Sequence, residues 1–144
     1  MAASSFAVVG PADVVLRAGK EVYQFLNAIA DAPAEVETLR FCIHDTTLLV
    51  EESKRYWEEL NDCVSSTSSS TTILNQALPQ FKSALRTLSR ELSALLTLAK
   101  RHNGITKSWG RLKFVLDERK ILKTRQRLEV SRSALGVALM LVGR

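Results

Sequence analysis

The chain has 144 residues, of which 46% are hydrophobic and 24% are charged. These proportions match an ordinary globular domain and exclude a wholly disordered chain. With six glycines and three prolines, the chain has little material for the many tight turns of an all-β fold. Its longest apolar run, ALGVALMLV, is well short of the roughly 20 residues of a membrane-spanning helix, and its first residues lack the basic start of a signal peptide. We therefore expect a cytoplasmic protein.

The charge is distributed unevenly along the chain. Residues 1–72 hold 5 Lys/Arg against 11 Asp/Glu, a net charge of −6. Residues 73–144 hold 15 against 4, a net charge of +11, so the whole chain has a net charge of +5. Such asymmetry has two physical uses: the halves attract each other within one fold, or the basic half meets an anionic partner.

The first two helices are predicted from their start signals and apolar spacing. Gly10-Pro11 followed by Asp13 is typical of a helix start. An apolar stripe follows at spacings of four and three, through Val15, Gly19, Val22, Leu26 and Ile29. Pro33 fits only a first turn, so we expect it to begin a second helix that runs to Leu60. Its predicted inner face carries Val36, Leu39, Ile43, Thr46, Val50, Trp57 and Leu60.

Eight consecutive hydroxyl residues, SSTSSSTT at 65–72, predict a flexible surface loop within the domain. A third helix follows, with a regular stripe through Leu74, Leu78, Phe81, Leu85, Leu88, Leu92, Leu95 and Ala99. Pro79 lies inside this stripe and predicts either a kink or a short separate turn before the main helix. Asn103-Gly104 is a typical left-handed stop after it.

The last third of the chain completes the predicted fold. Thr106 or Ser108 can cap the next segment, and Asp117 either starts another helix or lies inside one. Beyond it, Ile121, Leu128, Leu135 and Val142 lie one heptad apart. We therefore expect an all-α fold: an antiparallel four-helix bundle with one additional shorter helix. Residues 1–144 would form a single domain, the N-terminal module of a longer protein.

A cationic strip is predicted on the outside of the last helix. Arg119, Lys120, Lys123 and Arg127 fall opposite the Leu128 and Leu135 stripe on a helical wheel. This strip is a solvated face, a surface for anionic lipid, where each cation contributes roughly 1 kcal/mol, or a nucleic-acid surface. Nucleic acid is the least favoured of the three, because no recognition helix or platform of several aromatic rings accompanies the strip.

Two further features of the basic half bear on partners. Arg125 and Arg132 lie at the edge of the apolar stripe, where we expect them to reach carboxylates of the acidic half. From Ala134 onward the wheel is apolar nearly all round, and Val137, Met140 and Leu141 lie off the inner stripe. Either the bundle encloses this end, or these three residues dock onto a partner. Trp109, with Leu112 and Leu116 at helical spacing from it, is expected to be a core ring.

Catalysis is not expected. The sequence has no Gly-rich phosphate loop and no GxSxG or HExxH motif. Cys42 and His44 are two residues apart and so point to different faces of a helix, which argues against a zinc site. Cys42 and Cys63 are instead expected to be reduced thiols, with Cys42 buried. We expect no metal and no cofactor.

Nearly the whole chain resembles the fungal HeLo-like N-terminal domains. The resemblance rests on the apolar opening segment, the run FLNAIADAPAEVETLRFCIHDTTLLVEESKRYWEEL, the Ser-rich break, ALRTLSRELSALLTL and the final WGRLKFVLDERKILKTRQRLEVSRSALGVAL. Most telling are DAPAEV, at 31–36, and WGRLKF, at 109–114. The resemblance implies a four-helix cell-death effector domain at the N-terminus of an NLR-like (STAND) receptor of innate immunity. It implies self-association, contact with downstream receptor domains, and recruitment to a membrane on activation, and the cationic strip makes an anionic membrane the expected target. The short apolar stretch from Phe6 to Val9 departs from the pattern, because Gly10-Pro11 and Asp13 break it. A protein-binding adaptor without membrane activity is the alternative.

Overall fold

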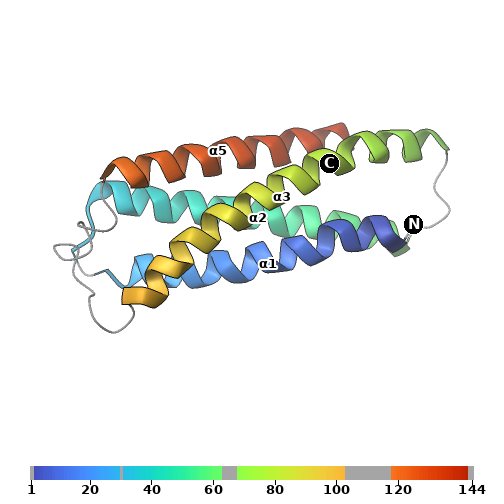
Figure 1. The fold of residues 1–144 in the computed structure, drawn as a ribbon. Helices are drawn as coiled ribbons and strands as arrows, with labels where there is room; N and C mark the ends of the chain where they lie inside the picture. The colour runs from blue at the N-terminus through green and yellow to red at the C-terminus, as the bar shows by residue number, and fades with distance from the viewer. Residues whose placement is uncertain (1, 30, 63–67, 103–117, 143–144) are drawn as a thin grey trace.

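The computed structural model describes residues 2–29, 31–62, 68–102 and 118–142. These residues form four helices and, within those ranges, no strand: α1 (Ala2–Asn27), α2 (Ala34–Asp62), α3 (Ser68–His102) and α5 (Glu118–Leu141) (Figure 1). The predicted all-α class is confirmed. Residues 103–117, where the additional shorter helix would fit, lie outside the described ranges, and that helix stays a prediction.

The helices form a bundle in which successive helices run in opposite directions (Figure 1). The pairs in extensive contact are α1 with α2, α1 with α3, α3 with α5, and α2 with α5. Each helix therefore has two neighbours, while α2 and α3, although consecutive in the sequence, lie diagonally across the bundle. The acidic helix α2 consequently has one neighbour from the basic half of the chain, which is α5.

The predicted start of the first helix is wrong. α1 begins at Ala2 and continues through Pro11, which lies inside the helix. A proline inside a helix removes one backbone hydrogen bond and crowds the preceding turn. Here the apolar spacing extends upstream of the proline, because Val8 is fully buried, as are Ala12 and Val15 beyond it. Burial of Val8 is a tertiary contribution that local start signals do not include.

The junction between α1 and α2 follows the prediction closely. Pro33 precedes the first residue of α2, and its carbonyl oxygen accepts hydrogen bonds from the amides of Val36 and Glu37 at 3.1 and 3.3 Å. Arg40 Nη1 donates to Asn27 Oδ1 at the end of α1, at 2.5 Å. Further along, Lys54 Nζ of α2 lies 2.7 Å from Asp13 Oδ1 of α1.

α3 is longer at its start than predicted. It begins at Ser68, so residues 68–72 are helical and the Ser/Thr loop expected over 65–72 is wrong for those five positions. Serine is among the residues that favour helix N-termini, which gives this start a local reason. Pro79 lies inside the continuous helix rather than after a separate turn. α3 is described as far as His102, and the stop predicted at Asn103-Gly104 lies outside the described residues.

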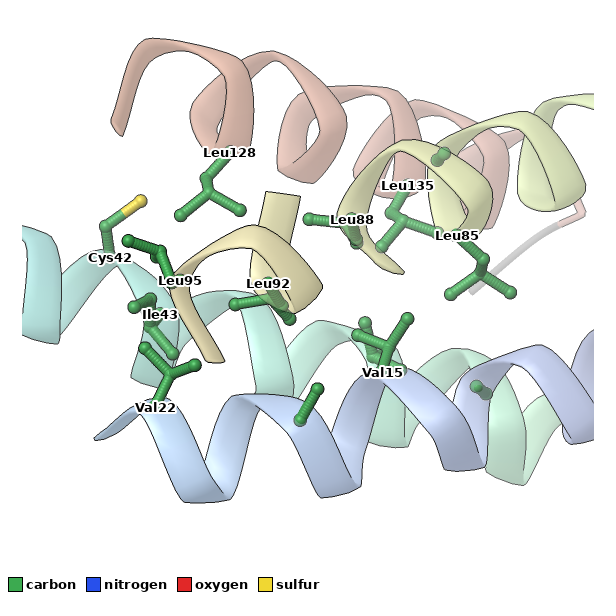
Figure 2. Packing of buried hydrophobic residues seen from close by; sticks show 14 of the residues in the cluster. Val15, Val22, Cys42, Ile43, Leu85, Leu88, Leu92, Leu95, Leu128 and Leu135 are labelled. Carbon is green, nitrogen blue, oxygen red and sulfur yellow. The ribbon is translucent and has the colours of Figure 1, made fainter. Parts of the chain in front are cut away.

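The core is built from the predicted stripes. Side chains of all four helices meet in the interior, including Val15, Ile43, Leu88 and Leu135 (Figure 2). The α5 heptad is confirmed, because Ile121, Leu128 and Leu135 are buried. Two buried hydroxyl side chains on α2 are satisfied locally. Thr46 donates to the Cys42 carbonyl at 2.7 Å and Ser53 to the Leu49 carbonyl at 2.9 Å.

Candidate functional site

The outer face of the first half of α5 carries the predicted cations. Arg119, Lys120, Lys123 and Arg127 are all exposed, on the side of the helix opposite buried Ile121 and Leu128. Arg127 Nη1 donates to Glu91 Oε1 of α3 at 3.1 Å. The Glu91 carboxylate is largely buried and offsets part of the Arg127 charge. The cationic end of this face is therefore centred on Arg119, Lys120 and Lys123.

The second half of the same face is apolar. Val137, Met140 and Leu141 are all exposed, and Met140 keeps 75% of its surface accessible. Their neighbours Leu135, Ala138 and Leu139 are buried, so the bundle encloses one side of this end of α5 and leaves the other side open. Val130 and Leu122 add to the exposed apolar surface. They were missed in the sequence, although the same helical wheel places both away from Ile121.

These residues define the outer face of α5: three cations in its first two turns, then apolar side chains to its end. Cations and exposed apolar side chains thus follow one another along one face of the helix, so both can meet a single partner surface. Among the four described helices, none is both long enough and apolar enough to cross a bilayer.

The two arginines predicted to reach the acidic half behave differently. Arg132 Nη1 lies 3.5 Å from Asp45 Oδ2 of α2, as expected. Arg125 Nε instead lies 3.7 Å from Glu129 Oε1, one turn along its own helix, so the prediction for Arg125 is wrong. A partner four residues away on the same helix is close regardless of bundle geometry, and it competes with carboxylates on neighbouring helices.

A groove of about 700 Å³ runs along the surface between α3 and α5. Pro79, Ser83 and Thr87 line it from α3, and Lys123 and Val130 are among the residues that line it from α5. The groove was not predicted, because helical periodicity shows which face of a helix is buried but not which helices are neighbours.

Cys42 and His44, the two residues of α2 considered for a zinc site, lie in different surroundings. Cys42 is buried and free, whereas His44 is exposed and its ring lies 5.8 Å from that of Tyr23. Within the part of the chain that the structure describes, no cluster of His, Cys, Asp and Glu side chains is arranged to hold a metal ion. Burial raises the pKa of the Cys42 thiol, and Glu129 raises it further. Cys63 and Trp109 lie outside the described ranges.

The ion pair between α1 and α2 has its own electrostatic effect. The hydrogen bond to Asp13 raises the pKa of the Lys54 ammonium. Lys54 therefore stays charged to a higher pH than an isolated lysine does, and it is engaged by Asp13 rather than available to a partner.

Comparison of the chain with family models, with curated proteins and with solved structures gave no significant match in any of the three.

Proposed function

We propose that this chain is a helical signalling domain that self-associates and binds anionic membranes through the outer face of α5. This is the activity that its resemblance to HeLo-like cell-death effector domains of fungal NLR-like receptors implies. In such a receptor, downstream domains would hold the bundle inactive and bring copies together on activation.

The observation that carries the proposal is the order of side chains on α5. Cations near an anionic membrane contribute roughly 1 kcal/mol each, so Arg119, Lys120 and Lys123 together contribute on the order of 3 kcal/mol. This attraction alone is modest and falls with salt. Exposed apolar side chains at the other end of the face, Val137, Met140 and Leu141, add the burial term that a peripheral helix needs.

Co-sedimentation with vesicles tests the membrane part. Wild-type chain should sediment with vesicles rich in phosphatidylserine and not with phosphatidylcholine vesicles, and added salt should weaken the binding. The charge-reversal variant Arg119→Glu/Lys120→Glu/Lys123→Glu should lose this binding. It leaves the Arg127–Glu91 pair of the folded bundle intact.

A matched control comes from α3. The variant Lys82→Glu/Arg86→Glu/Arg90→Glu changes the net charge by the same amount at exposed positions on a different helix. It should keep more vesicle binding than the α5 variant if a defined face is responsible. Equal losses would mean that only net charge matters, and a wild-type chain that ignores anionic vesicles would refute the membrane part.

A protein-binding adaptor without membrane activity is the second candidate. The groove between α3 and α5 favours it, because an open channel between two helices can receive the face of a third helix. Binding to a protein or to a second copy, together with no vesicle binding, would select this function over the first.

A further inference from the structure

α2 presents an unusual stripe to solvent. On the outer side of this helix, seven residues follow one another at alternating spacings of four and three, which is the spacing usually found in a core stripe. All seven are exposed: Glu37, Phe41, His44, Leu48, Glu51, Arg55 and Glu58. Two of them are large apolar side chains, with Phe41 57% and Leu48 51% accessible. The Arg40 guanidinium lies 5.2 Å from the centre of the Phe41 ring, a contact that restrains the ring at the surface.

The two apolar side chains are flanked by acids. Phe41 and Leu48 are seven residues apart, which is about 10 Å along a helix. Glu37 lies one turn before Phe41, and Glu51 lies three residues after Leu48. The apolar pair therefore has a carboxylate on each side of it along the helix. α2 as a whole carries eight Asp/Glu against three Lys/Arg.

The groove between α3 and α5 is complementary in length and charge. Its lining spans Pro79 to Thr87 on α3 and Lys123 to Ala134 on α5, about 12 and 16 Å respectively. Those lengths accommodate two anchors about 10 Å apart. Lys123 and Arg127 are the charged residues of the lining, and α3 and α5 together carry 11 Lys/Arg against three Asp/Glu.

We propose that the groove binds the outer stripe of α2 from a second copy of this chain, with Phe41 and Leu48 as anchors and an acid of the stripe beside Lys123. This inference rests on the self-association in the proposed function and names the surfaces that carry it. The two surfaces do not meet within one molecule, because α2 lies diagonally across from α3 and its outer stripe opens on a different side of the bundle.

Such an interface is head to tail. Each copy uses its α2 stripe on one neighbour and its groove on another, so association continues into a ring or a filament rather than stopping at a symmetric dimer. One helix face in one open groove is small beside a standard protein interface, and association of isolated chains is therefore weak and salt-sensitive. Holding copies close together strengthens it through a higher effective concentration.

Two variants block one surface each at exposed positions. Ser83→Glu/Lys123→Glu places acid in the groove, and Leu48→Lys/Glu51→Lys places cations in the α2 stripe. Sedimentation velocity at low ionic strength should show concentration-dependent assembly of the wild-type chain. Each variant alone should assemble at least about tenfold more weakly. Their equimolar mixture should give a 1:1 complex and nothing larger, because each variant supplies the one surface that the other lacks.

Matched controls apply the same chemical changes elsewhere. Val14→Lys/Glu21→Lys on α1 matches the α2 variant, and Ser93→Glu/Lys100→Glu on α3, outside the groove, matches the groove variant. Both controls should assemble like wild type. Circular dichroism of all four variants should show the wild-type helical content.

The other outcomes contradict the interface. Assembly that neither blocking variant weakens, or a mixture without the 1:1 complex, overturns the α2-to-groove contact and leaves self-association through another surface standing. A wild-type chain that stays monomeric at sub-millimolar concentration and low salt overturns both this contact and the self-association in the proposed function. Because Lys123 belongs to both the groove and the outer face of α5, vesicle binding is tested independently of this contact with Arg119→Glu/Lys120→Glu, which leaves the groove lining unchanged.

Discussion

Trp57 of α2 and Phe81 of α3 meet edge to face in the core, with ring centroids 5.5 Å apart and an interplanar angle of 88°. Their helices lie diagonally across the bundle, so these two rings connect elements that otherwise have little contact. Both side chains are buried. We expect Trp57→Ala and Phe81→Ala each to lower the free energy of unfolding by about 3–5 kcal/mol.

The coupling between the two rings is a separate measurement. A double-mutant cycle by urea denaturation should give an interaction energy of about 0.5–1.5 kcal/mol beyond the two single losses. If either alanine variant is too unstable to measure, Phe81→Leu and Trp57→Leu serve in the same cycle, because both substitutions remove the aromatic ring. Strictly additive losses would mean that the rings do not touch and that the diagonal contact is absent.

Gly19 sets the distance between α1 and α2. A Cβ atom built at Gly19 would lie 2.6 Å from Thr47 Cγ2, and Thr47 is held by the hydrogen bond from its hydroxyl to the His44 carbonyl at 2.7 Å. Overpacking of this kind costs about 1–3 kcal/mol. The gain of alanine over glycine in a helix is roughly 1 kcal/mol at most. Gly19→Ala should therefore destabilise the bundle.

The same substitution at Gly136 is the control. A Cβ atom there meets nothing within 4 Å, so Gly136→Ala in α5 should raise the free energy of unfolding by about 0.5–1 kcal/mol. Thermal melts of the two variants should shift in opposite directions. Stabilisation by Gly19→Ala would contradict the close approach of α1 and α2.

The Cys42 thiol predicts a loss of stability at alkaline pH. Burial raises its pKa in the folded chain above the ordinary value of 9.0, so the unfolded chain ionises first as pH rises. Stability from this group is complete below that value and is lost as pH rises through the raised pKa of the folded chain. Urea unfolding at about pH 7 and about pH 10 should show a larger decrease for wild type than for Cys42→Ala. Equal decreases in stability for wild type and Cys42→Ala would mean that the Cys42 thiol is in contact with water in the folded chain.

The surface ion pair between α2 and α5 should contribute little. Arg132 and Asp45 are both partly exposed at 3.5 Å, and pairs of this kind are worth about 0–1 kcal/mol. We expect Asp45→Asn to change the free energy of unfolding by less than about 1 kcal/mol, and less still at high salt. A loss of several kcal/mol would show that attraction between the two halves of the chain holds the bundle together.

The fold could be predicted to the extent that it depends on periodicity. The α5 heptad Ile121, Leu128 and Leu135 and the proline at the start of α2 are local patterns with one structural meaning. The start of α1 could not be predicted in this way. Pro11 is a strong local signal, and the burial of Val8 that outweighs it depends on neighbouring helices.

In the candidate site, too, the features that depend on a single helix could be predicted better than those that depend on neighbouring helices. A helical wheel places Lys123 and Met140 outside the core stripe, and both are exposed in the structure. It does not show that Arg127 meets Glu91, because that contact depends on the register of α5 against α3. The groove between these helices requires the same information. The faces of single helices could therefore be predicted from the sequence, and the charge asymmetry predicted that Arg132 meets a carboxylate of the acidic half. The neighbours that depend on helix register, such as Glu91 for Arg127, could not be predicted.

Placement of the outer face of α5 at a membrane is the central claim, and a polarity-sensitive dye on that face tests it most directly. The dye would be attached to Met140→Cys in a Cys63→Ser background, because Cys42 is buried and protected from labelling in the folded chain. In the control, the dye would be attached to Gln24→Cys, at an exposed position of α1 in the same background. On addition of phosphatidylserine vesicles, we predict a blue shift at position 140 and none at position 24. No shift at position 140 while the protein is bound to vesicles, or equal shifts at both positions, would contradict the account.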